Sequence, residues 1–396
     1  MSMQLGIGLS TQRDPVLAAK EAVIQARIKL HDSKISLAIV FSSIDIASPI
    51  LLKVIGSYLA GAQVLGCSGL GFISERGIFK HGLIILLLSF GEGLYFNTAQ
   101  VKDIRMKSPL TAGEELGEKL LSKFKNIRRD ISVVFSDGLI QSSPDLITGL
   151  QKNLGRSFPV VGALASDNLA FKKTYTYFNQ EALDDAACGV IFGGKLTYGL
   201  GTKHGWFPLG KPRWVTKSSG NIVNEIEHEP AVKVYEDYLA KNTAELKKEL
   251  KRISILYPIG IYLPGEQEFL LRNISSIEPD GSIIFQGDVP ENSEIRLMIG
   301  TKETCLDAAA QAVEEVKKGL SGRPIKFALV FDSVSRYILL GRHASKELEV
   351  LRDGLGRDTP IVGLYTYGEQ APLRAVSYLG RTYFHNQTIT VLGIGA

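Results

Sequence analysis

ISLAIVFSS (35–43), DISVVFSDG (130–138) and KFALVFDSVS (326–335) share one pattern, in which a short aliphatic run leads to a phenylalanine and then to small polar residues. Each is followed by a second segment of a common pattern, and these are QVLGCSGLGFIS (63–74), FPVVGALASDN (158–168) and TPIVGLYTYGE (359–369). Nearly continuous apolar runs of this length predict strands that are buried on both faces. The sequence therefore predicts three copies of one unit, with polar side chains at the ends of buried strands.

Helices and a closing strand complete each predicted copy. A helix precedes each first strand, and the three are expected at 15–30 from Asp14-Pro15, at 112–124 from the capping-box spacing Thr111…Glu114, and at 305–320 from Thr304. A second helix lies between the strands, where Ser48-Pro49 and Ser143-Pro144 supply the N-cap and first residue in two copies. Closing strands are expected at 81–90, 187–194 and 388–396.

The predicted fold class is α/β (mixed α+β), with three helix-strand-helix-strand-strand repeats forming two domains whose buried mixed sheets are covered by helices. A Pro-, Gly- and Ser-rich stretch (205–221) precedes a helical stretch (229–252) and indicates the boundary. Residues 1–225 would hold two repeats. Residues 226–396 would hold one repeat and an extra hairpin at 270–289 around Pro279-Asp280-Gly281.

Composition is typical of a globular protein and disfavours several classes of partner. The longest apolar run is about one strand long, well short of the ~20 residues that span a bilayer. The formal charge is +4 with basic and acidic residues interleaved, so we expect no nucleic-acid binding. The three cysteines are widely spaced and no basic segment precedes an apolar one at the start, which together favour reduced thiols and a cytoplasmic location.

No metal or cofactor site is expected. The six histidines stand apart, and the chain has no Cys-x-x-Cys or His-Glu-x-x-His motif. Residues 66–71 read G-x-x-G-x-G, which is not the order of the dinucleotide-binding fingerprint, and the FISERG that follows does not begin a helix. We therefore interpret these glycines as a turn between two strands.

Arg336 and the YTYGE segment (365–369) of the third copy are the strongest candidates for ligand binding. Tyr365, Tyr367 and Glu369 share one face of a strand by period two, next in the repeat to Arg336. An arginine and a glutamate at neighbouring strand ends suit a zwitterion, since the guanidinium binds a carboxylate and the carboxylate binds an ammonium group. The alternative is an internal pair of Arg336 with Asp332 or Glu369.

The other candidates come from strand ends in all three copies. His204 and Trp206 would supply a hydrogen-bonding partner and an apolar wall, or simply end a strand beneath the linker. His385-Asn386 matches Asn179 of another copy, where a turn is the alternative to a ligand contact. Cys67 and Ser68 could instead act as nucleophiles with His204 or His385, which makes an amidase or hydrolase the alternative function. Asp167 completes the ligand-binding set.

Seven motifs in order resemble the FIST proteins, a sensory family of signalling proteins with an N-terminal and a C-terminal FIST region. They are VVGALASD (160–167), HGWFPLG (204–210), the VT and GN of 214–239, GDVPENSEIRLM (288–298), FDSVSR (331–336), VGLYTYGEQAP (362–372) and FHNQTITVL (384–392). The resemblance covers nearly the whole chain. Where the family tends to have a small residue and Cys before the arginine, this chain has Val334-Ser335 before Arg336, so no role is carried over for a thiol there.

The resemblance implies a domain that binds small ligands, with amino acids as one such class, and passes the signal to an output partner in trans. We therefore expect a small-molecule sensor whose pocket lies at the strand ends of the C-terminal unit, against the N-terminal domain. A scaffold that binds only proteins is a third reading. The free edges of the predicted sheets would permit a homodimer.

Overall fold

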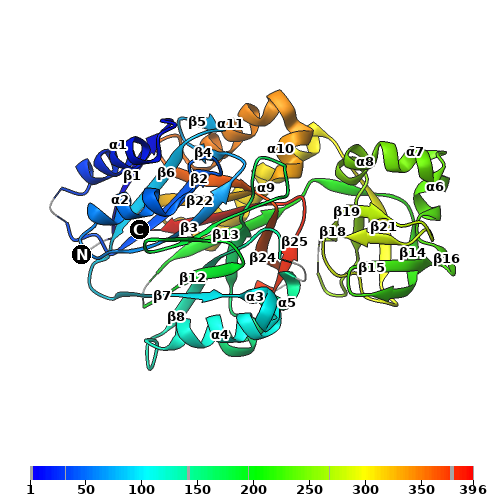
Figure 1. Cartoon of the computed structure of the whole chain (residues 1–396), viewed down its shortest axis with the longest axis horizontal. Helices are drawn as coiled ribbons and strands as arrows, with labels where there is room; N and C mark the ends of the chain where they lie inside the picture. Colours follow the sequence, from blue (N-terminus) through cyan, green and yellow to red (C-terminus); the bar gives the residue numbers. More distant parts are fainter. Residues whose placement is uncertain are drawn as a thin grey trace.

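Four mixed or antiparallel sheets build the computed structural model, which describes residues 3–31, 33–140, 143–194, 196–266, 268–374 and 379–395. The mixed α/β class predicted from the sequence is confirmed. Three sheets of six strands form one body, and the fourth, of eight strands, forms a second body to its side (Figure 1).

The three six-stranded sheets have one strand order. The first runs β1 (Gln4–Ser10), β6 (Leu83–Ser89), β2 (Leu37–Ser43), β3 (Gln63–Gly69), β10 (Thr176–Phe178), β11 (Glu181–Leu183). The second runs β7 (Leu94–Lys102), β12 (Ala186–Gly194), β8 (Arg129–Ser136), β9 (Val160–Leu164), β24 (Gly368–Arg374), β25 (Leu379–His385). The third runs β13 (Tyr198–Lys203), β26 (Ile389–Gly395), β22 (Ile325–Ser333), β23 (Ile361–Thr366), β4 (Phe72–Ser74), β5 (Gly77–Phe79). Each unit thus adds an edge strand, β1, β7 or β13, and the sequence analysis had expected only the third of these, as the strand that ends before His204.

Each unit also gives a hairpin to a neighbouring sheet. After β3 the chain leaves the first sheet, and β4 pairs with β23 of the third. After β9 it leaves the second sheet, and β10 pairs with β3 of the first. After β23 it leaves the third sheet, and β24 pairs with β9 of the second. The exchange closes a ring of three sheets, so the second strand of every unit ends where the chain crosses between sheets.

The centre of the ring is apolar and aromatic. Within each unit the first two strands are parallel, with Phe41 opposite Cys67, Phe135 opposite Ala163 and Phe331 opposite Leu364. The three phenylalanine rings meet edge to face, with centroid separations of 5.3, 6.3 and 5.8 Å. The shared Phe of the sequence pattern is therefore the residue at which the three units meet.

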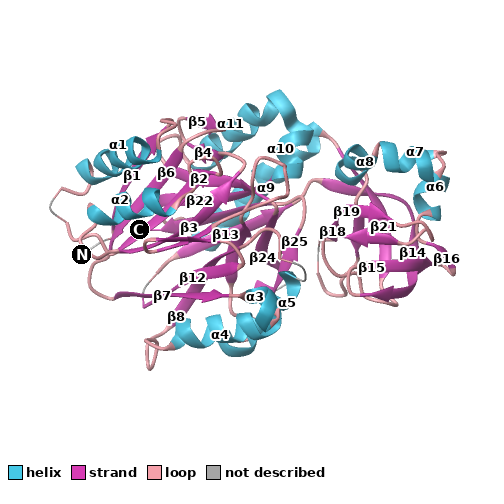
Figure 2. Ribbon diagram, in the orientation of Figure 1, coloured by secondary structure: helices cyan, strands magenta, loops and turns pink. Residues whose placement is uncertain are grey.

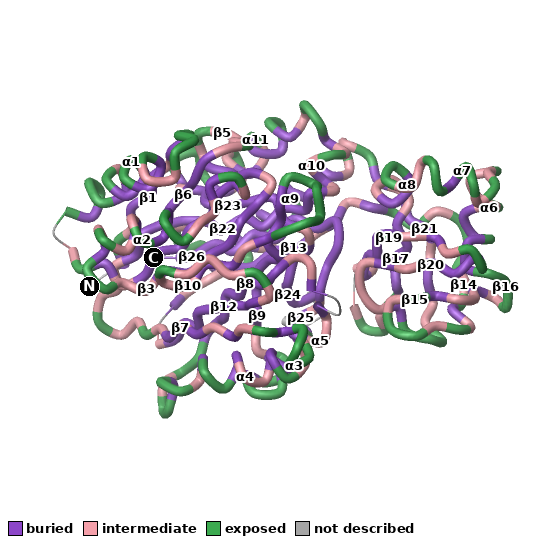
Figure 3. The backbone as a smooth tube through the Cα atoms, in the orientation of Figure 1, coloured by how far each residue is buried: buried purple, intermediate pink, exposed green. Residues whose placement is uncertain are grey.

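Helices cover the outer face of each sheet (Figure 2). They are α1 (Pro15–Ile28) and α2 (Pro49–Ser57), α4 (Pro109–Leu121) and α5 (Ser143–Leu154), and α9 (Lys302–Leu320) and α11 (Ala344–Leu355), with α3 (Ile104–Lys107), α10 (Val334–Leu340) and a 3-10 turn (Gly341–His343) in the connections. Strand β2 shows why both faces are apolar: Ile39 and Phe41 point to the shared centre, whereas Ala38 and Val40 pack beneath α1 and α2. The strands form the buried interior of Figure 3.

Two expected helix starts were wrong. Helix α4 begins at Pro109 with Ser108 as its N-cap, because Ser108 Oγ accepts the N–H of Thr111, so the expected capping box at Thr111 does not form. Helix α9 begins at Lys302, where the side chains of Thr301 and Thr304 form a capping box three residues before the expected position. In both cases another residue that can cap a helix, Ser108 or Thr301, precedes the expected cap by three residues.

The fourth sheet is an insertion between β13 and α9. Its strands are β14 (Trp206–Ser219), β15 (Ile222–Ile226), β16 (Glu229–Pro230), β17 (Ile259–Ile261), β18 (Leu270–Arg272), β19 (Ile274–Ile277), β20 (Ile283–Phe285) and β21 (Glu294–Gly300), with helices α6 (Lys233–Leu239), α7 (Thr243–Lys248) and α8 (Leu250–Leu256). It has a core of its own, centred on residues such as Tyr235, Phe285 and Ile259. The predicted hairpin is present as β19 and β20, with Gly281 at φ 84° in the turn.

The insertion is larger than the extra hairpin expected from the sequence. Position 225, the expected domain boundary, lies within β15, and β13 already belongs to the sheet of the third unit. The division of the chain at 225 stays a prediction. Among the helices of the described residues, none combines the length and apolar character needed to cross a bilayer.

Candidate functional site

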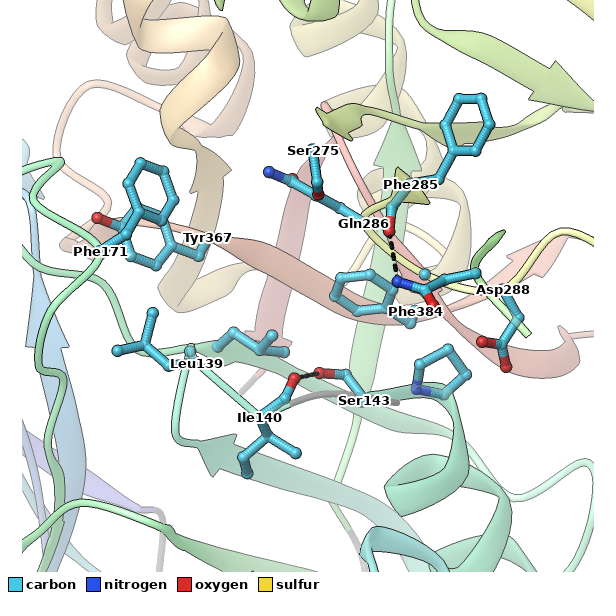
Figure 4. A pocket seen from close by; sticks show the side chains of 15 residues that line it. Leu139, Ile140, Ser143, Phe171, Ser275, Phe285, Gln286, Asp288, Tyr367 and Phe384 are labelled. Atoms are coloured by element: carbon cyan, nitrogen blue, oxygen red, sulfur yellow. Dashed lines mark hydrogen bonds between the residues drawn. The ribbon is translucent and has the colours of Figure 1, made fainter. Parts of the chain in front are cut away.

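Two adjoining cavities lie between the insertion and the strand ends of the second and third units. The larger has a volume of about 440 Å³ and the smaller about 220 Å³. They share four lining residues, Phe171 and Tyr367 from the three-sheet body and Ser275 and Gln286 from the insertion. Figure 4 shows the smaller cavity, with the stacked rings of Phe171 and Tyr367 on one side and Ser275 and Gln286 across from them. We call the two cavities and their shared wall the cleft.

Tyr367 lies in the cleft because the chain changes sheets at this residue. Strand β23 ends at Thr366 in the third sheet and β24 begins at Gly368 in the second. A Cβ at Gly368 would come within 2.3 Å of the Phe384 ring, so glycine is required for this close crossing. The sharp exit turns the Tyr367 side chain away from both sheets and toward the insertion.

Asp167 organises the loop that carries Phe171. The Asp167 carboxylate accepts the hydroxyl of Tyr367 and four backbone N–H groups, those of Ala170 (2.8 Å), Phe171 (3.1 Å), Lys172 (2.9 Å) and Lys173 (3.3 Å). Burial raises the pKa of Asp167, but the hydrogen bonds from Tyr367 and the backbone outweigh it and hold the pKa below its usual value. The sequence candidate Asp167 thus positions the aromatic wall of the cleft.

The Phe171 ring is held flat against Tyr367. Its centroid lies 4.4 Å from that of Tyr367 with 9° between the ring planes, and Phe171 has φ 51°, an unusual conformation for a bulky residue. Phe171 nevertheless remains 51% exposed. An aromatic ring that is fixed in place and partly exposed offers apolar area against which a ligand can pack.

We expect Asp167→Asn to destabilise the loop, with an effect that depends on pH. Each bond to the charged carboxylate contributes about 1.5–3 kcal/mol before neighbouring bonds are shared. Because the folded-state pKa is lowered, this stability is present above the unfolded pKa of about 4 and is lost as pH falls through the folded pKa. Urea unfolding at pH 7 and pH 3 should show a larger difference between wild type and variant at pH 7. An equal difference at both values would mean that the charge of Asp167 does not hold the loop.

The insertion contributes the polar wall of the cleft. The backbone N–H of Gln286 donates to the carbonyl oxygen of Asn273 (2.8 Å), which fixes the ends of β19 and β20 side by side. Asn273 Nδ2 donates to Gln286 Oε1 (3.4 Å) and to Ser335 Oγ (3.2 Å), so this side chain bridges the insertion and α10 of the third unit. The polar wall of the cleft is therefore connected by hydrogen bonds to both the insertion and the three-sheet body.

Each cavity has one charged residue among its described lining residues. Lys251, on α8, lines the larger cavity, and Asp288, which follows β20, lines the smaller. Burial and the nearby Asp145 raise the pKa of Asp288, and Arg272 opposes this. Arg272 donates to the backbone oxygen of Asp288, Leu271 and Phe384, so its contact with Asp288 is not through the carboxylate.

Arg336 does not face the cleft. It is fully buried, and its guanidinium donates to Asp332 Oδ1 (3.0 Å), to Glu347, and to the backbone oxygens of His204 (2.5 Å) and Cys305 (2.9 Å). The expectation that Arg336 binds a ligand carboxylate is corrected by this geometry, because helix α10 turns the side chain into the space between β22 and α11. The alternative of an internal pair with Asp332 is the arrangement found.

Tyr365 and Glu369 are also turned away from the cleft. Tyr365 is buried with its ring against Tyr337, at a centroid separation of 4.4 Å. The Glu369 carboxylate accepts Thr366 Oγ1 (2.5 Å) and the N–H and hydroxyl of Thr388 (3.2 and 2.7 Å), and burial raises its pKa to about 8. The expected shared face of residues 365, 367 and 369 was wrong because period two fails where the chain leaves one sheet for another.

His204 lies where the chain enters the insertion, whereas His385 bonds within the hairpin of β24 and β25. His204 Nδ1 accepts the backbone N–H of Trp206 (2.9 Å), and burial lowers the pKa of His204 to about 4. Trp206 is buried and donates from Nε1 to the Ile255 carbonyl oxygen (3.0 Å), which matches the alternative of a strand end packed beneath the linker. His385 contacts the carbonyl oxygen of Ala371 (2.9 Å), and Asn386 Oδ1 accepts the N–H of Asn273 (3.4 Å).

The first unit contributes no catalytic pair among the described residues. Cys67 is fully buried and burial raises its pKa, which disfavours the reactive thiolate. Ser68 Oγ donates to the carbonyl oxygen of Ser166 (2.9 Å) and accepts the N–H of Tyr175 (3.0 Å). Neither side chain bonds to His204 or His385, so the nucleophile and base that a hydrolase needs are not brought together.

Most of the cleft was not found from the sequence. Of the eleven candidates only Tyr367 lines it, and Asp167 and Asn386 hold residues that line it, whereas Phe171, Ser275, Gln286, Lys251 and Asp288 were missed. Phe171 carried a weak signal, because a phenylalanine in the largely polar stretch 167–174 has no predicted strand or helix to bury it. The hairpin residues Ser275 and Gln286 carried none, since only tertiary packing brings them to this place.

The curated relatives that match the chain are uncharacterized proteins, so their names give no activity. An uncharacterized protein of Methanocaldococcus jannaschii is 26% identical over 277 residues, which is 65% of this chain and 51% of the relative, so the chain spans about half the length of that protein. Uncharacterized proteins of Mycobacterium tuberculosis and Mycobacterium bovis are each 24% identical, over 94% and 98% of this chain and 95% and 98% of the relatives.

A crystal structure of cyanuric acid hydrolase from A. caulinodans aligns with the whole of both chains at a TM-score of 0.40 and 7% identity. Family models match most of the chain: a FIST N domain at residues 36–229 and a FIST C domain at residues 231–372. The chain belongs to the FIST family, whose domains are associated with sensing in signal transduction.

Proposed function

We propose that this protein is a sensor of signal transduction that binds a small ligand in the cleft. The observation that carries the proposal is the pair of adjoining cavities whose shared wall is made by Phe171 and Tyr367 on one body and Ser275 and Gln286 on the other. The volume of the larger cavity, about 440 Å³, lies within the range of small-molecule sites. Its lining mixes apolar side chains with hydroxyl and amide groups.

A ligand in the cleft would couple the insertion to the three-sheet body. The two bodies are joined by the chain at residues 204–205 and 301, and they contact each other through Asn273, Ser335 and Gln387. A ligand that contacts both walls favours one relative position of the bodies, and this shift in population is the form in which binding can reach an output partner. The output partner in trans, a homodimer and a cytoplasmic location remain part of the proposal.

Amino acids remain the first class of ligand to test, although the residues expected to hold them have changed. Arg336 and Glu369 are occupied by internal partners, so a zwitterion would have to use the groups of the cleft. No hydrolytic function is proposed, because Cys67 and Ser68 lack a base within hydrogen-bond reach among the described residues.

Thermal unfolding in the presence of ligand pools tests this function. A ligand at about 100 times its Kd adds about 2.7 kcal/mol to the free energy of unfolding, which raises Tm by a few degrees for a protein of this size. We expect a pool of small metabolites that includes the common amino acids to raise the Tm of the wild type and not that of Tyr367→Ala. Tyr95→Ala, which removes an exposed tyrosine on β7 far from the cleft lining, should keep the shift. Equal shifts in all three proteins would place the ligand elsewhere.

A further inference from the structure

Lys251 and Asp288 are the two charges of the cleft, and they lie in different cavities. Lys251 is exposed and Asp288 is partly buried, and the structure gives neither side chain an ion pair within the described residues. Asp145 adds a second negative charge close to Asp288, and the buried Arg272 offsets it in part. The cleft is thus negative at its smaller end and positive at its larger end.

Between these charges the wall of the cleft is neutral and suited to peptide groups. Ser275 and Gln286 line both cavities and offer a hydroxyl and an amide, each of which can donate and accept. Opposite them the stacked Phe171 and Tyr367 rings present an apolar surface. The smaller cavity is also lined by the apolar groups of Ile140 and Phe384, together with the polar Ser143 and Asn221, so it can hold a side chain beside the negative end.

We propose that the ligand of the cleft is a short peptide with free termini, bound with its ammonium group at Asp288, its carboxylate at Lys251, and its amide groups between Ser275 and Gln286. This inference rests on the proposed function and narrows it. A free amino acid has both charges on one carbon atom, which suits two charges in separate cavities less well than a peptide does. In a dipeptide or tripeptide they stand about 7–10 Å apart.

The test is equilibrium dialysis of the full-length protein against defined pools, with mass spectrometry to measure which compounds are retained. The pools are the common amino acids, free dipeptides and tripeptides, and the same peptides acetylated at the amino end or amidated at the carboxyl end. We expect retention of free peptides. Acetylation and amidation should each weaken binding roughly ten- to a hundredfold, because each removes one charge-assisted bond.

Variants assign each end of the peptide to its partner. In Asp288→Asn, acetylated and free peptides should bind equally weakly, and in Lys251→Met the same should hold for amidated and free peptides. Glu229→Gln and Lys247→Met remove exposed charges of the insertion outside the cleft and should behave as the wild type. Each variant is also compared with wild type by urea unfolding, so that loss of fold is not read as loss of contact.

Each remaining outcome decides a different claim. Retention of amino acids but not peptides would overturn the peptide inference and leave the small-ligand function standing. Capped peptides that bind as tightly as free ones would also overturn the inference, since the end charges would then play no part. No retention from any of these pools, nor from neutral sugars dialysed in parallel, would overturn the inference and count against the proposed function as well.

Discussion

Arg336→Met should unfold at a much lower urea concentration than the wild type, with a loss of about 3–5 kcal/mol in the free energy of unfolding. The guanidinium is fully buried and is the cation for both Asp332 and Glu347, so its removal leaves carboxylates without a partner. Burial and the charge of Glu347 already raise the pKa of Asp332, and Arg336 opposes this. Removal of Arg336 is therefore expected to leave the buried carboxyl groups of Asp332 and Glu347 without a cation.

Two further variants control this result. Arg342→Met removes an exposed arginine in the 3-10 turn that follows α10 and should change the free energy of unfolding by less than about 0.5 kcal/mol. Adding Glu347→Gln to Arg336→Met should restore part of the loss, because one of the two stranded charges is gone. An Arg336→Met protein of wild-type stability that no longer responded to ligand would contradict the internal role and return Arg336 to the binding site.

Phe135→Ala should cost about 3–5 kcal/mol in the free energy of unfolding, because the ring is fully buried and its loss leaves a cavity where the three units meet. Phe41→Ala and Phe331→Ala should each cost a similar amount, since every ring of the cluster touches the other two. Urea unfolding followed by circular dichroism measures all three.

The matched control is Phe207→Ala, which removes a ring that is 55% exposed on β14 of the insertion and should have little effect. Pairs of substitutions within the cluster should cost less than the sum of the single ones, because the second ring is removed from a site already loosened. If only one of the three phenylalanines mattered, the centre of the ring would not be a shared core.

The strands of the three units could be predicted because each is a short apolar run with a recurring end. Both faces of β2 are buried, one by the shared centre and one by α1 and α2, and continuous apolar sequence is what such a strand requires. The exchange of hairpins could not be predicted, since nothing in residues 72–79 distinguishes pairing with β23 from pairing within their own unit. Pairing partners are chosen by tertiary packing.

The site was harder to predict than the fold for the same reason. Period two placed Tyr365, Tyr367 and Glu369 on one face, but the crossing at Gly368 separates them. Asp332 could be named as a partner of Arg336 from its spacing of four residues, whereas Glu347 comes from α11 and depends on how that helix packs. The two walls of the cleft meet only because the insertion lies over the ends of the second and third units.

The most direct test of the central claim, that the ligand occupies the cleft between the insertion and the three-sheet body, is to fill the cleft and measure binding. Ser275 lines both cavities, so Ser275→Trp should block them, and Ala244→Trp places the same side chain on the exposed surface of α7. With the compounds that wild-type protein retains in equilibrium dialysis, we predict that Ser275→Trp retains none and Ala244→Trp retains all, at equal thermal stability. Retention by a folded Ser275→Trp protein at the wild-type level would show that the ligand binds somewhere else.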